Sequence, residues 1–552
     1  MLLNLDITEK SFGPQVLYTG LKFDVQPGEK VGLIGRNGTG KSTLLHIITG
    51  DDKDFQGTVD LKRNATIIAS RQEHHGHEAK TVLEYIQGDL PEFAKLHHIL
   101  MTYPDRMGDD TQMLQRYSDA LERFTQLGYF QIESEITQAM EAYQLDPAKL
   151  EAPLSSLSGG QKRMVELIKV QRARGHLALI DEPTNHMDYI AKQEFIKWLS
   201  SAPEAVMVIT HDRDVLGEVD KIIEIRNGRA YSFNGNYKKY LSINTNQITS
   251  QVNEYDLVQR RIKNLTNDVI RFRRMKEKAR DPGTIKRFKS QEQRAEAELE
   301  KLGVAERPSF WIDRENVEDL NPKLSGAYEK YKAKNIQLST KSTDSRSSRL
   351  LVEARKVSLG YGDKPLFSGI DFSLHEGERI RLHGRNGAGK TTLVNEIVAQ
   401  ATGTKTSATR FEGTIAVETG IKIGQYEQEI DAKYLKLSLH DAIEQSCLEK
   451  DVKVGEQKIK QLLGEYLFNP EVDGKTPIER LSGGQKARFQ LIRMLLGEPL
   501  LLILDEPTNH LDLPSIEELE DALANYHGAV IYISHDSYFA KKLGGQTIAI
   551  GN

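Results

Sequence analysis

Short unbroken apolar runs mark the expected strands of this chain. Residues 177–180, 206–209, 501–504 and 530–533 are such runs, the second and fourth followed by Thr210 and Ser534, and another run leads into a glycine-rich loop at Gly35. Runs of this kind are typical of buried parallel strands. A helix is expected to begin directly after the loop, at Leu44-Leu45. The pattern predicts an α/β fold.

A different pattern occupies the middle of the chain. Apolar positions advance there by three and four residues, as in a heptad repeat. They are Tyr255, Val258, Ile262, Leu265, Val269 and Phe272, then, beyond Asp281-Pro282-Gly283, Ile285, Phe288, Ala295, Leu299 and Leu302. Glu292 interrupts the second seam. Two seams around a turn predict an antiparallel helical hairpin at about residues 250–304.

The chain also repeats itself. Ser158, Glu182 and His211 recur as Ser482, Glu506 and His535, each 324 positions later. We therefore predict two related domains in tandem, residues 1–240 and 350–552, joined by a linker at 241–349 that holds the hairpin and a return segment. The first domain has about 32 extra residues ahead of its repeated serine. A helical insertion is expected there, around residues 90–140.

Composition sets few further limits. The chain has 552 residues, 38% of them apolar, and a formal net charge of −5, which gives no global attraction to nucleic acid. It has no apolar run of about 18 residues, and its start lacks the pattern of a signal peptide. We expect a cytoplasmic protein without a membrane partner. The single cysteine, Cys447, excludes an internal disulfide framework and a zinc site built on cysteines.

The first candidate site is a glycine-rich loop that occurs twice. Its pattern is Gly35, Gly38, Gly40, Lys41 and Ser42 in one copy and Gly384, Gly387, Gly389, Lys390 and Thr391 in the other. Backbone N–H groups of such a loop surround phosphate oxygens, the lysine reaches the outer phosphates, and the hydroxyl can ligate magnesium. We expect both loops to bind ATP, with further contributions from Asn37, Thr39, Thr43, Asn386, Ala388 and Thr392.

Two adjacent acids end a buried-type strand in each domain. The pairs are Asp181-Glu182 and Asp505-Glu506. We expect each aspartate in the magnesium shell and each glutamate to orient and polarise the attacking water. Thirty residues after each aspartate stand His211 and His535. A histidine there can hydrogen-bond the terminal phosphate, so both glutamates and both histidines are expected to be catalytic.

A third motif indicates the class of ATPase. Ser158-Gly159-Gly160-Gln161 and Ser482-Gly483-Gly484-Gln485 lie 23 positions before the acidic pairs. The motif resembles the signature of ATP-binding cassette (ABC) ATPases, whose cassettes pair head to tail. By that resemblance, the signature of the second cassette would complete the ATP site of Lys41, and that of the first cassette the site of Lys390. The resemblance implies a monomer with two composite sites for ATP and Mg²⁺.

Two more pairs of residues fit the cassette pattern. Phe12 and Tyr361 each lie 29 residues before the loop lysine and are expected to stack on adenine, although core packing would explain either one alone. Gln72 and Gln428 are candidates to contact magnesium and the attacking water. Gln425 competes with Gln428 for that role.

The residues after each catalytic glutamate narrow the family. They are Pro183-Thr184-Asn185-His186-Met187-Asp188 and Pro507-Thr508-Asn509-His510-Leu511-Asp512. This phrase resembles that of the ABC-F family, soluble tandem cassettes that act on the ribosome. Met187 departs from the phrase, and Ser537 stands where the family more often has arginine.

The hairpin is basic in an otherwise acidic chain. Residues 260–289 hold twelve basic and three acidic residues. Such a run is usually a solvated face, but its place near a hairpin tip favours contact with a phosphate backbone. The candidate RNA-binding residues are Arg271, Arg273, Arg274, Lys276, Lys278, Arg280, Lys286, Arg287 and Lys289. The plain alternative is a spacer between the cassettes.

The favoured hypothesis is an ATP-hydrolysing ABC-F protein that binds the ribosome near the tRNA exit region. By the resemblance, closure on ATP would push the hairpin toward peptidyl-tRNA and rRNA at the peptidyl-transferase centre. The role would be that of a translation factor or of an antibiotic-resistance ribosome-protection protein. The alternatives are an ATPase subunit of a transporter with a separate membrane partner and a DNA-acting cassette ATPase.

Overall fold

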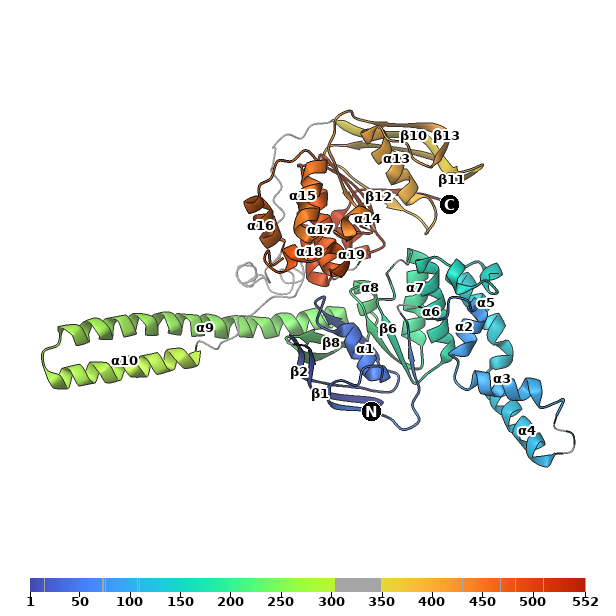
Figure 1. Ribbon diagram of the computed structural model, residues 1–552, viewed down its shortest axis with the longest axis horizontal. Helices are drawn as coiled ribbons and strands as arrows, with labels where there is room; N and C mark the ends of the chain where they lie inside the picture. Colours follow the sequence, from blue (N-terminus) through green and yellow to red (C-terminus); the bar gives the residue numbers. More distant parts are fainter. Residues whose placement is uncertain are drawn as a thin grey trace. The chain divides into compact units, whose positions relative to one another are not determined.

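The computed structural model describes the chain except residues 14, 72–73, 75, 107, 109, 186, 303–348, 428–429, 467, 482, 510 and 552. It consists of two compact units, Met1–Tyr237 with Ile336–Asn552, and Lys238–Asn335 (Figure 1). The first unit holds both cassettes, and the second holds the helical hairpin. Most of the expected return segment, and Gln72, Gln428 and Ser482 among the candidate site residues, lie outside the described residues.

The first cassette contains two sheets. In the smaller one, β1 (Leu3–Phe12) pairs antiparallel with β2 (Gln15–Val25) and β4 (Gln56–Leu61). The larger sheet has the order β5-β6-β7-β3-β8-β9 and is parallel except for β9. Its strands are β3 (Lys30–Gly35), β5 (Ile67–Ala69), β6 (Leu177–Asp181), β7 (Ala205–Ile209), β8 (Lys221–Arg226) and β9 (Arg229–Asn234).

The two sheets and α1 (Lys41–Thr49) share one core. Leu5, Phe23, Leu33 and Leu44 are buried in it, one each from β1, β2, β3 and α1. The apolar runs expected to be buried strands form β6 and β7, and every residue of these strands is buried. The sequence pattern therefore identified the central strands correctly, and the fold is α/β as predicted.

Apart from α1, the helices of the first cassette come between successive strands of the larger sheet along the chain. They are α2 (Val82–Gly88), α3 (Phe93–Thr102), α4 (Thr111–Gln126), α5 (Ile132–Ala142), α6 (Gly159–Ala173), α7 (Tyr189–Ser201) and α8 (Arg213–Leu216). Helices α3, α4 and most of α5 occupy the range expected for the insertion. Phe93, Phe124 and Tyr129 pack ring against ring there, with centroids 5.3–5.7 Å apart.

The second cassette has the same plan. Its antiparallel sheet is β11-β10-β13 and its parallel sheet is β14-β15-β16-β12-β17. The strands are β10 (Leu350–Tyr361), β11 (Lys364–His375), β12 (Arg379–His383), β13 (Thr409–Val417), β14 (Ile423–Tyr426), β15 (Leu501–Asp505), β16 (Ala529–Ile533) and β17 (Gln546–Ala549). The helices are α13 (Lys390–Thr402), α14 (Ala432–Leu435), α15 (Leu439–Glu449), α16 (Glu456–Glu465), α17 (Gly483–Leu495), α18 (Leu513–Ala524) and α19 (Ser537–Leu543).

Strand order places the candidate chemistry at one edge of each parallel sheet. In the first cassette β7 lies between β6 and β3. The glycine-rich loop follows β3, the two acids end β6, and His211 follows β7. Carboxyl ends of neighbouring parallel strands meet at the same edge, where open α/β sheets bind ligands. In the second cassette β12, β15 and β16 repeat this arrangement.

The hairpin consists of α9 (Tyr237–Lys278) and α10 (Pro282–Leu302). Helix α9 thus begins before the expected range of about 250–304. Leu265, Val269 and Ala295 are buried together, while the side chains of Tyr255 and Leu302 lie outside the described part. Asp281 starts α10 by accepting the backbone N–H of Thr284 at 2.8 Å.

Glu292, the residue that breaks the apolar seam, carries a cross-hairpin ion pair. It is 7% exposed. Its carboxylate binds Arg273 Nε at 2.9 Å and also binds the ammonium of Lys276. The interruption in the sequence pattern is therefore a polar layer that joins the two helices. Across the described residues, no helix has the length and apolar character needed to span a membrane.

Candidate ATP sites

The last glycine of each loop meets a steric requirement. Gly40 has φ +91°, and a Cβ there would come within 2.5 Å of the Tyr18 hydroxyl, which itself donates to the Gly40 carbonyl. Gly389 has φ +96°, and its Cβ would come within 2.8 Å of the Phe367 ring. A side chain would be strained at either position both by the backbone and by lack of space. The loops can therefore take this shape because these residues are glycine.

Each loop lysine lies inside its own loop. Lys41 Nζ donates to the Gly35 carbonyl at 2.7 Å and to the Arg36 carbonyl at 3.2 Å. Lys390 Nζ makes the same contacts with the carbonyls of residues 384 and 385, at 2.7 and 2.8 Å. Burial lowers the pKa of both ammonium groups, against the opposing charges of Glu182 and Glu506. A phosphate bound in either loop would add a stronger acceptor for the lysine.

The hydroxyl residue directly after each loop lysine faces the aspartate that ends β6 or β15. Ser42 Oγ donates to Asp181 Oδ2 at 2.7 Å, and Thr391 Oγ1 donates to Asp505 Oδ2 at 2.7 Å. Burial raises the pKa of Asp505, against the hydrogen bond from Thr391. Both groups are oxygen donors of the kind that Mg²⁺ prefers, and their side chains already converge. These residues therefore fit a magnesium ion bound beside the phosphates.

The two candidate catalytic glutamates share an uncommon backbone. Glu182 has φ +46° and Glu506 has φ +47°, in the left-handed region that non-glycine residues rarely adopt. Their N–H groups donate to the carbonyls of Ile209 and Ile533 on the next strand, at 2.8 and 3.0 Å. The same local strain in both cassettes turns the side chain toward the site, as functional residues often require.

Burial also raises the pKa of both glutamate carboxyl groups. It raises the pKa of Glu182 to about 8, although Lys41 acts in the opposite direction. It raises the pKa of Glu506 to about 7, assisted by the charge of Asp505. A carboxyl group with a pKa near neutrality can take a proton from an attacking water far better than an ordinary glutamate.

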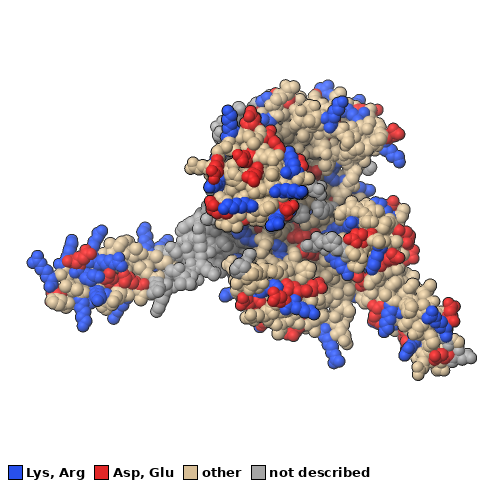
Figure 2. Space-filling model, viewed as in Figure 1, with Lys and Arg blue, Asp and Glu red and all other residues tan. Residues whose placement is uncertain are grey.

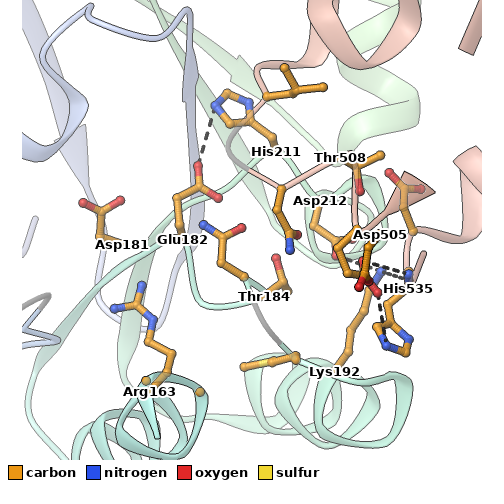
Figure 3. Close-up of a pocket in the computed structure, with 18 of the residues that line it drawn as sticks. Arg163, Asp181, Glu182, Thr184, Lys192, His211, Asp212, Asp505, Thr508 and His535 are labelled. Atoms are coloured by element: carbon orange, nitrogen blue, oxygen red, sulfur yellow. Dashed lines mark hydrogen bonds and ion pairs between the residues drawn. The ribbon is translucent and has the colours of Figure 1, made fainter. Parts of the chain in front are cut away.

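The two histidines face these glutamates. His211 Nε2 lies 3.6 Å from Glu182 Oε1 (Figure 3), and His535 Nε2 lies 3.3 Å from Glu506 Oε1. Burial lowers the pKa of both imidazoles to about 3, so they are neutral at physiological pH. Within the described part of the chain, the ring nitrogens are buried and lack a hydrogen-bond partner. Such nitrogens fit a partner supplied by a phosphate oxygen or a water.

The first signature serine begins a helix. Ser158 caps α6, accepting the N–H of Gln161 at 3.3 Å, while the Gln161 side chain accepts the N–H of Ser158 at 3.1 Å. This capping box engages Gln161 in holding the helix start. In the second signature, Gln485 donates to Asp473 at 3.2 Å, and helix α17 begins at Gly483.

The aromatic candidates remain accessible. Phe12 is 55% exposed and Tyr361 is 49% exposed, and both line the same cavity as the loops. The Tyr361 hydroxyl lies 3.4 Å from Thr392 Oγ1. Such exposure leaves a ring face free for stacking and disfavours the alternative of core packing. Gln425 lies in β14, paired with Ile503.

Side chains of each cassette reach the glycine-rich loop of the other. Asp188 Oδ2 accepts the N–H of Asn386 at 3.2 Å, and Asp512 Oδ2 accepts the N–H of Asn37 at 3.2 Å. One cavity of about 1420 Å³ is lined by both loops, both acidic pairs, both histidines and the first signature. We call the part with Lys41 the first ATP site and the part with Lys390 the second ATP site.

Sequence reasoning missed a buried cluster beside the first site. Glu166 of α6 accepts the N–H of Arg71 at 2.9 Å and pairs with the buried Lys169 at 2.8 Å. Gln490 of α17, 324 positions later, accepts the N–H of Glu427 at 3.3 Å. Arg71 and Glu427 directly precede Gln72 and Gln428. The same hydrogen bond thus recurs in both cassettes with different residue types. Comparing helices α6 and α17, which follow the two signature motifs, could have revealed it.

The fold and the duplicated site define an ABC ATPase. Residues 18–185 and 367–509 match a family model described as ABC transporter, and residues 223–318 match a second model of the same description. The chain is 30% identical over 535 residues to the probable ATP-binding protein YheS of Escherichia coli K12, covering 96% of this chain and 75% of that protein. This protein therefore binds and hydrolyses ATP.

Two further relatives carry names that describe a role. The energy-dependent translational throttle protein EttA of Mycobacterium tuberculosis is 29% identical over 542 residues, covering 96% of this chain and 88% of its own. The ribosome protection protein VmlR of Bacillus subtilis is 27% identical over 555 residues, covering 98% of this chain and 84% of that protein. The chain belongs to the ABC-F family, as its motifs predicted. A solved RNase-L Inhibitor shares the fold, with a TM-score of 0.57 at 16% identity over 99% of this chain and 87% of that one.

Proposed function

We propose that this protein is a ribosome-binding ATPase whose basic hairpin contacts RNA at the translating ribosome, near peptidyl-tRNA. Support comes from the names of its relatives EttA and VmlR, which refer to translation and to ribosome protection. The observation that carries the RNA contact is the distribution of charge on α9 and α10. The proposal places the protein in the cytoplasm.

The candidate RNA-binding residues of the hairpin fall into two groups. Arg273 and Lys276 are held by Glu292, and Arg273 also binds Glu296 at 2.6 Å. The other candidates are exposed and have no ion pair within the described residues. They are Arg271, Arg274, Lys278, Arg280, Lys286, Arg287 and Lys289. Figure 2 shows this concentration of Lys and Arg over the outer end of the hairpin.

Exposed, unpaired cations near a tip suit a phosphate backbone. Each such residue that neutralises a phosphate releases counterions, which favours association and makes it depend on salt. Structured RNA is recognised largely through its shape and its phosphates, so a rigid two-helix rod can present these charges without reading bases. This supports an RNA contact over the alternative of a plain spacer.

ATP binding and hydrolysis at the two sites would control whether the cassettes are open or closed. ATP held between the loop of one cassette and the signature of the other favours the closed state over the open one. Glu182 and Glu506 would then orient and deprotonate the attacking water, and the neutral His211 and His535 would hydrogen-bond the terminal phosphate. Mg²⁺ held by the Ser42–Asp181 and Thr391–Asp505 pairs would neutralise phosphate charge. Hydrolysis would end the closed state and release the ribosome.

A trapping experiment tests the proposal. The Glu182→Gln, Glu506→Gln double variant should co-sediment with ribosomes in the presence of ATP, and far less in its absence, because closure without hydrolysis prolongs binding. Adding Lys278→Glu and Arg280→Glu at the tip should weaken this binding and reduce its salt dependence. Adding Lys436→Glu and Lys453→Glu, at two exposed positions of the second cassette, changes the net charge equally and serves as the matched control. A double variant that stays free of ribosomes with ATP would refute the proposal.

Drug tolerance separates the two roles within this function. If the protein protects ribosomes, cells that express it should tolerate a ribosome-directed antibiotic that kills the parent strain, and Lys278→Glu with Arg280→Glu should abolish the tolerance. If it is a translation factor, tolerance should not change, whereas polysome profiles should differ between cells with and without the protein.

A further inference from the structure

The two ATP sites share their motifs but differ in the groups around the catalytic histidine. The position 324 residues after Lys192 is Ile516, and both side chains line the shared cavity. On the strand before each loop, the second cassette has Arg381 and His383, where the first has Gly32 and Ile34. These three differences place cationic and titratable side chains beside the histidine of the second site.

Lys192 joins the first cassette to the histidine of the second. It lies in the first turn of α7 and is 6% exposed. Its ammonium binds Asp212 at 2.7 Å and Asp214 at 2.5 Å, and it lies 3.4 Å from the backbone carbonyl of His535 (Figure 3). Burial opposes its charge, but the two aspartates raise the pKa of the ammonium above the ordinary value.

The loop that carries His535 is held from two further directions. Arg381 of the same cassette donates to the carbonyl of Ser534 at 3.0 Å. Ser537 Oγ donates to Asp214 of the first cassette at 2.7 Å. Ser537 is the residue that departs from the ABC-F pattern, and the departure allows a short hydroxyl to meet the aspartate that Lys192 also binds. Both ends of the His535 loop are therefore fixed.

The loop that carries His211 shares Lys192 through the side chain of Asp212, but its other contacts differ. Arg213 follows it and pairs with the buried Glu520 of α18 at 3.1 Å. The residue equivalent to Glu520 in the first cassette is Ile196, and the equivalent of Arg213 is Ser537. The first site also has Arg163 on the side of its carboxylates (Figure 3), where the second cassette has Ala487. Extra positive charge lies near the acids in the first site and near the histidine in the second.

We propose that the two ATP sites are inequivalent, and that Lys192 is a positioning residue which holds His535 of the second site from the opposite cassette. The ammonium fixes the backbone of the histidine through its carbonyl, and the histidine in turn faces Glu506. Hydrolysis at the second site then depends on α7 of the first cassette. The first site depends on Lys192 less directly, through the side chain of Asp212 after His211, and Ile516 offers no donor to the His211 carbonyl.

Site-selective backgrounds test this in the full-length protein without ribosomes, so the outcome is independent of the proposed ribosomal function. Glu182→Gln leaves the second site to hydrolyse ATP, and Glu506→Gln leaves the first. Lys192→Ile should lower kcat about tenfold in the Glu182→Gln background, equal to about 1.4 kcal/mol in the barrier. KM should stay within about twofold, because the ammonium is held by Asp212 and Asp214 and meets the histidine only at its backbone carbonyl. In the Glu506→Gln background kcat should fall by less than about twofold.

Rescue and matched controls separate positioning from folding. Lys192→Arg should keep most of the second-site kcat, since it retains a cation that can reach the carbonyl. Lys197→Ile removes an exposed lysine from the same helix and should leave both backgrounds unchanged. If Lys192→Ile lowers the melting temperature strongly, the Lys192→Met, Asp214→Asn double variant keeps the net charge and should show the same selective loss. Equal losses in both backgrounds, or no loss in the Glu182→Gln background, would overturn the proposal.

Discussion

The carboxylate of Asp188 links its own helix to Asn386 in the opposite glycine-rich loop. Its Oδ1 accepts the N–H of Ala191 at 3.0 Å and so caps α7, while Oδ2 accepts the N–H of Asn386 at 3.2 Å. Asp512 repeats both contacts, with Ser515 in α18 and with Asn37. One side chain thus combines a local cap with a contact between cassettes.

The two contacts of Asp188 can be separated by substitution. Asp188→Ala removes both, so the melting temperature should fall by a few degrees, in line with the about 1 kcal/mol of a lost helix cap, and ATPase activity should fall severalfold. Asp188→Ser retains a capping oxygen but is too short to reach Asn386. It should restore the melting temperature and leave the ATPase defect, as measured by thermal unfolding and phosphate release. Recovery of both would show that the cap alone matters.

The hydroxyl and carboxylate pairs predict a metal requirement. Ser42→Ala and Thr391→Ala remove one oxygen donor each, so the Mg²⁺ concentration for half-maximal ATPase activity should rise about tenfold in the double variant. The same variant should bind ATP in EDTA as the parent does, measured by equilibrium dialysis. A magnesium titration that overlays the parent curve would contradict the assignment. EDTA should abolish hydrolysis in both proteins.

The hydrogen bond that Glu166 accepts from the Arg71 N–H, and that Gln490 accepts from the Glu427 N–H, predicts graded losses of stability. Glu166→Ala leaves Lys169 without its buried partner and the Arg71 N–H without an acceptor, so the melting temperature should fall by several degrees. Glu166→Gln keeps an acceptor of the type that Gln490 provides, so its loss should be smaller. Gln490→Ala is the matched change in the second cassette and should cost less than Glu166→Ala, because Gln490 carries no charge. Equal losses for Glu166→Gln and Glu166→Ala would contradict this order.

Lys450 predicts a pH-dependent stability change. Burial lowers the pKa of its ammonium to about 8, assisted by the nearby Arg493. Below pH 8 the folded protein holds a charge in an unfavourable place, so Lys450→Met should raise the melting temperature there by a few degrees. Between pH 8 and about 10.5 the unfolded chain binds the proton and the folded one does not, so the parent gains stability and the advantage should shrink. Lys458→Met, on the exposed face of α16, is the control. An advantage that grows above pH 8 would contradict the assigned direction.

Local patterns carried most of what the sequence could predict. The apolar runs gave β6, β7, β15 and β16, and the heptad seams gave the hairpin. The duplicated motifs gave the family and the class of reaction, because each requires particular residue types over a few positions. The glycine at position 40 could be predicted for the same reason, since phosphate loops need a left-handed turn there.

Contacts between distant segments could not be predicted in this way. Asp188 and Lys192 act on residues of the other cassette, and no local pattern indicates a partner some 200 or 340 positions away. The capping role of Gln161 could have been predicted, because a serine followed three residues later by a glutamine is the pattern of a capping box. The left-handed backbone of Glu182 gave no signal, since strain of this kind depends on the strands that flank the residue.

The ion pair at Glu292 determines how far the hairpin can extend. If α10 slid along α9 by one heptad, Glu292 would leave Arg273 and Lys276, and an apolar residue would take its place opposite those two charges. A buried polar residue among apolar ones is a recognised device for fixing the alignment of paired helices. One heptad of a helix is about 10 Å long. Glu292 therefore fixes the length of the hairpin to within one heptad. It also fixes the position of the basic residues at the tip along the hairpin axis.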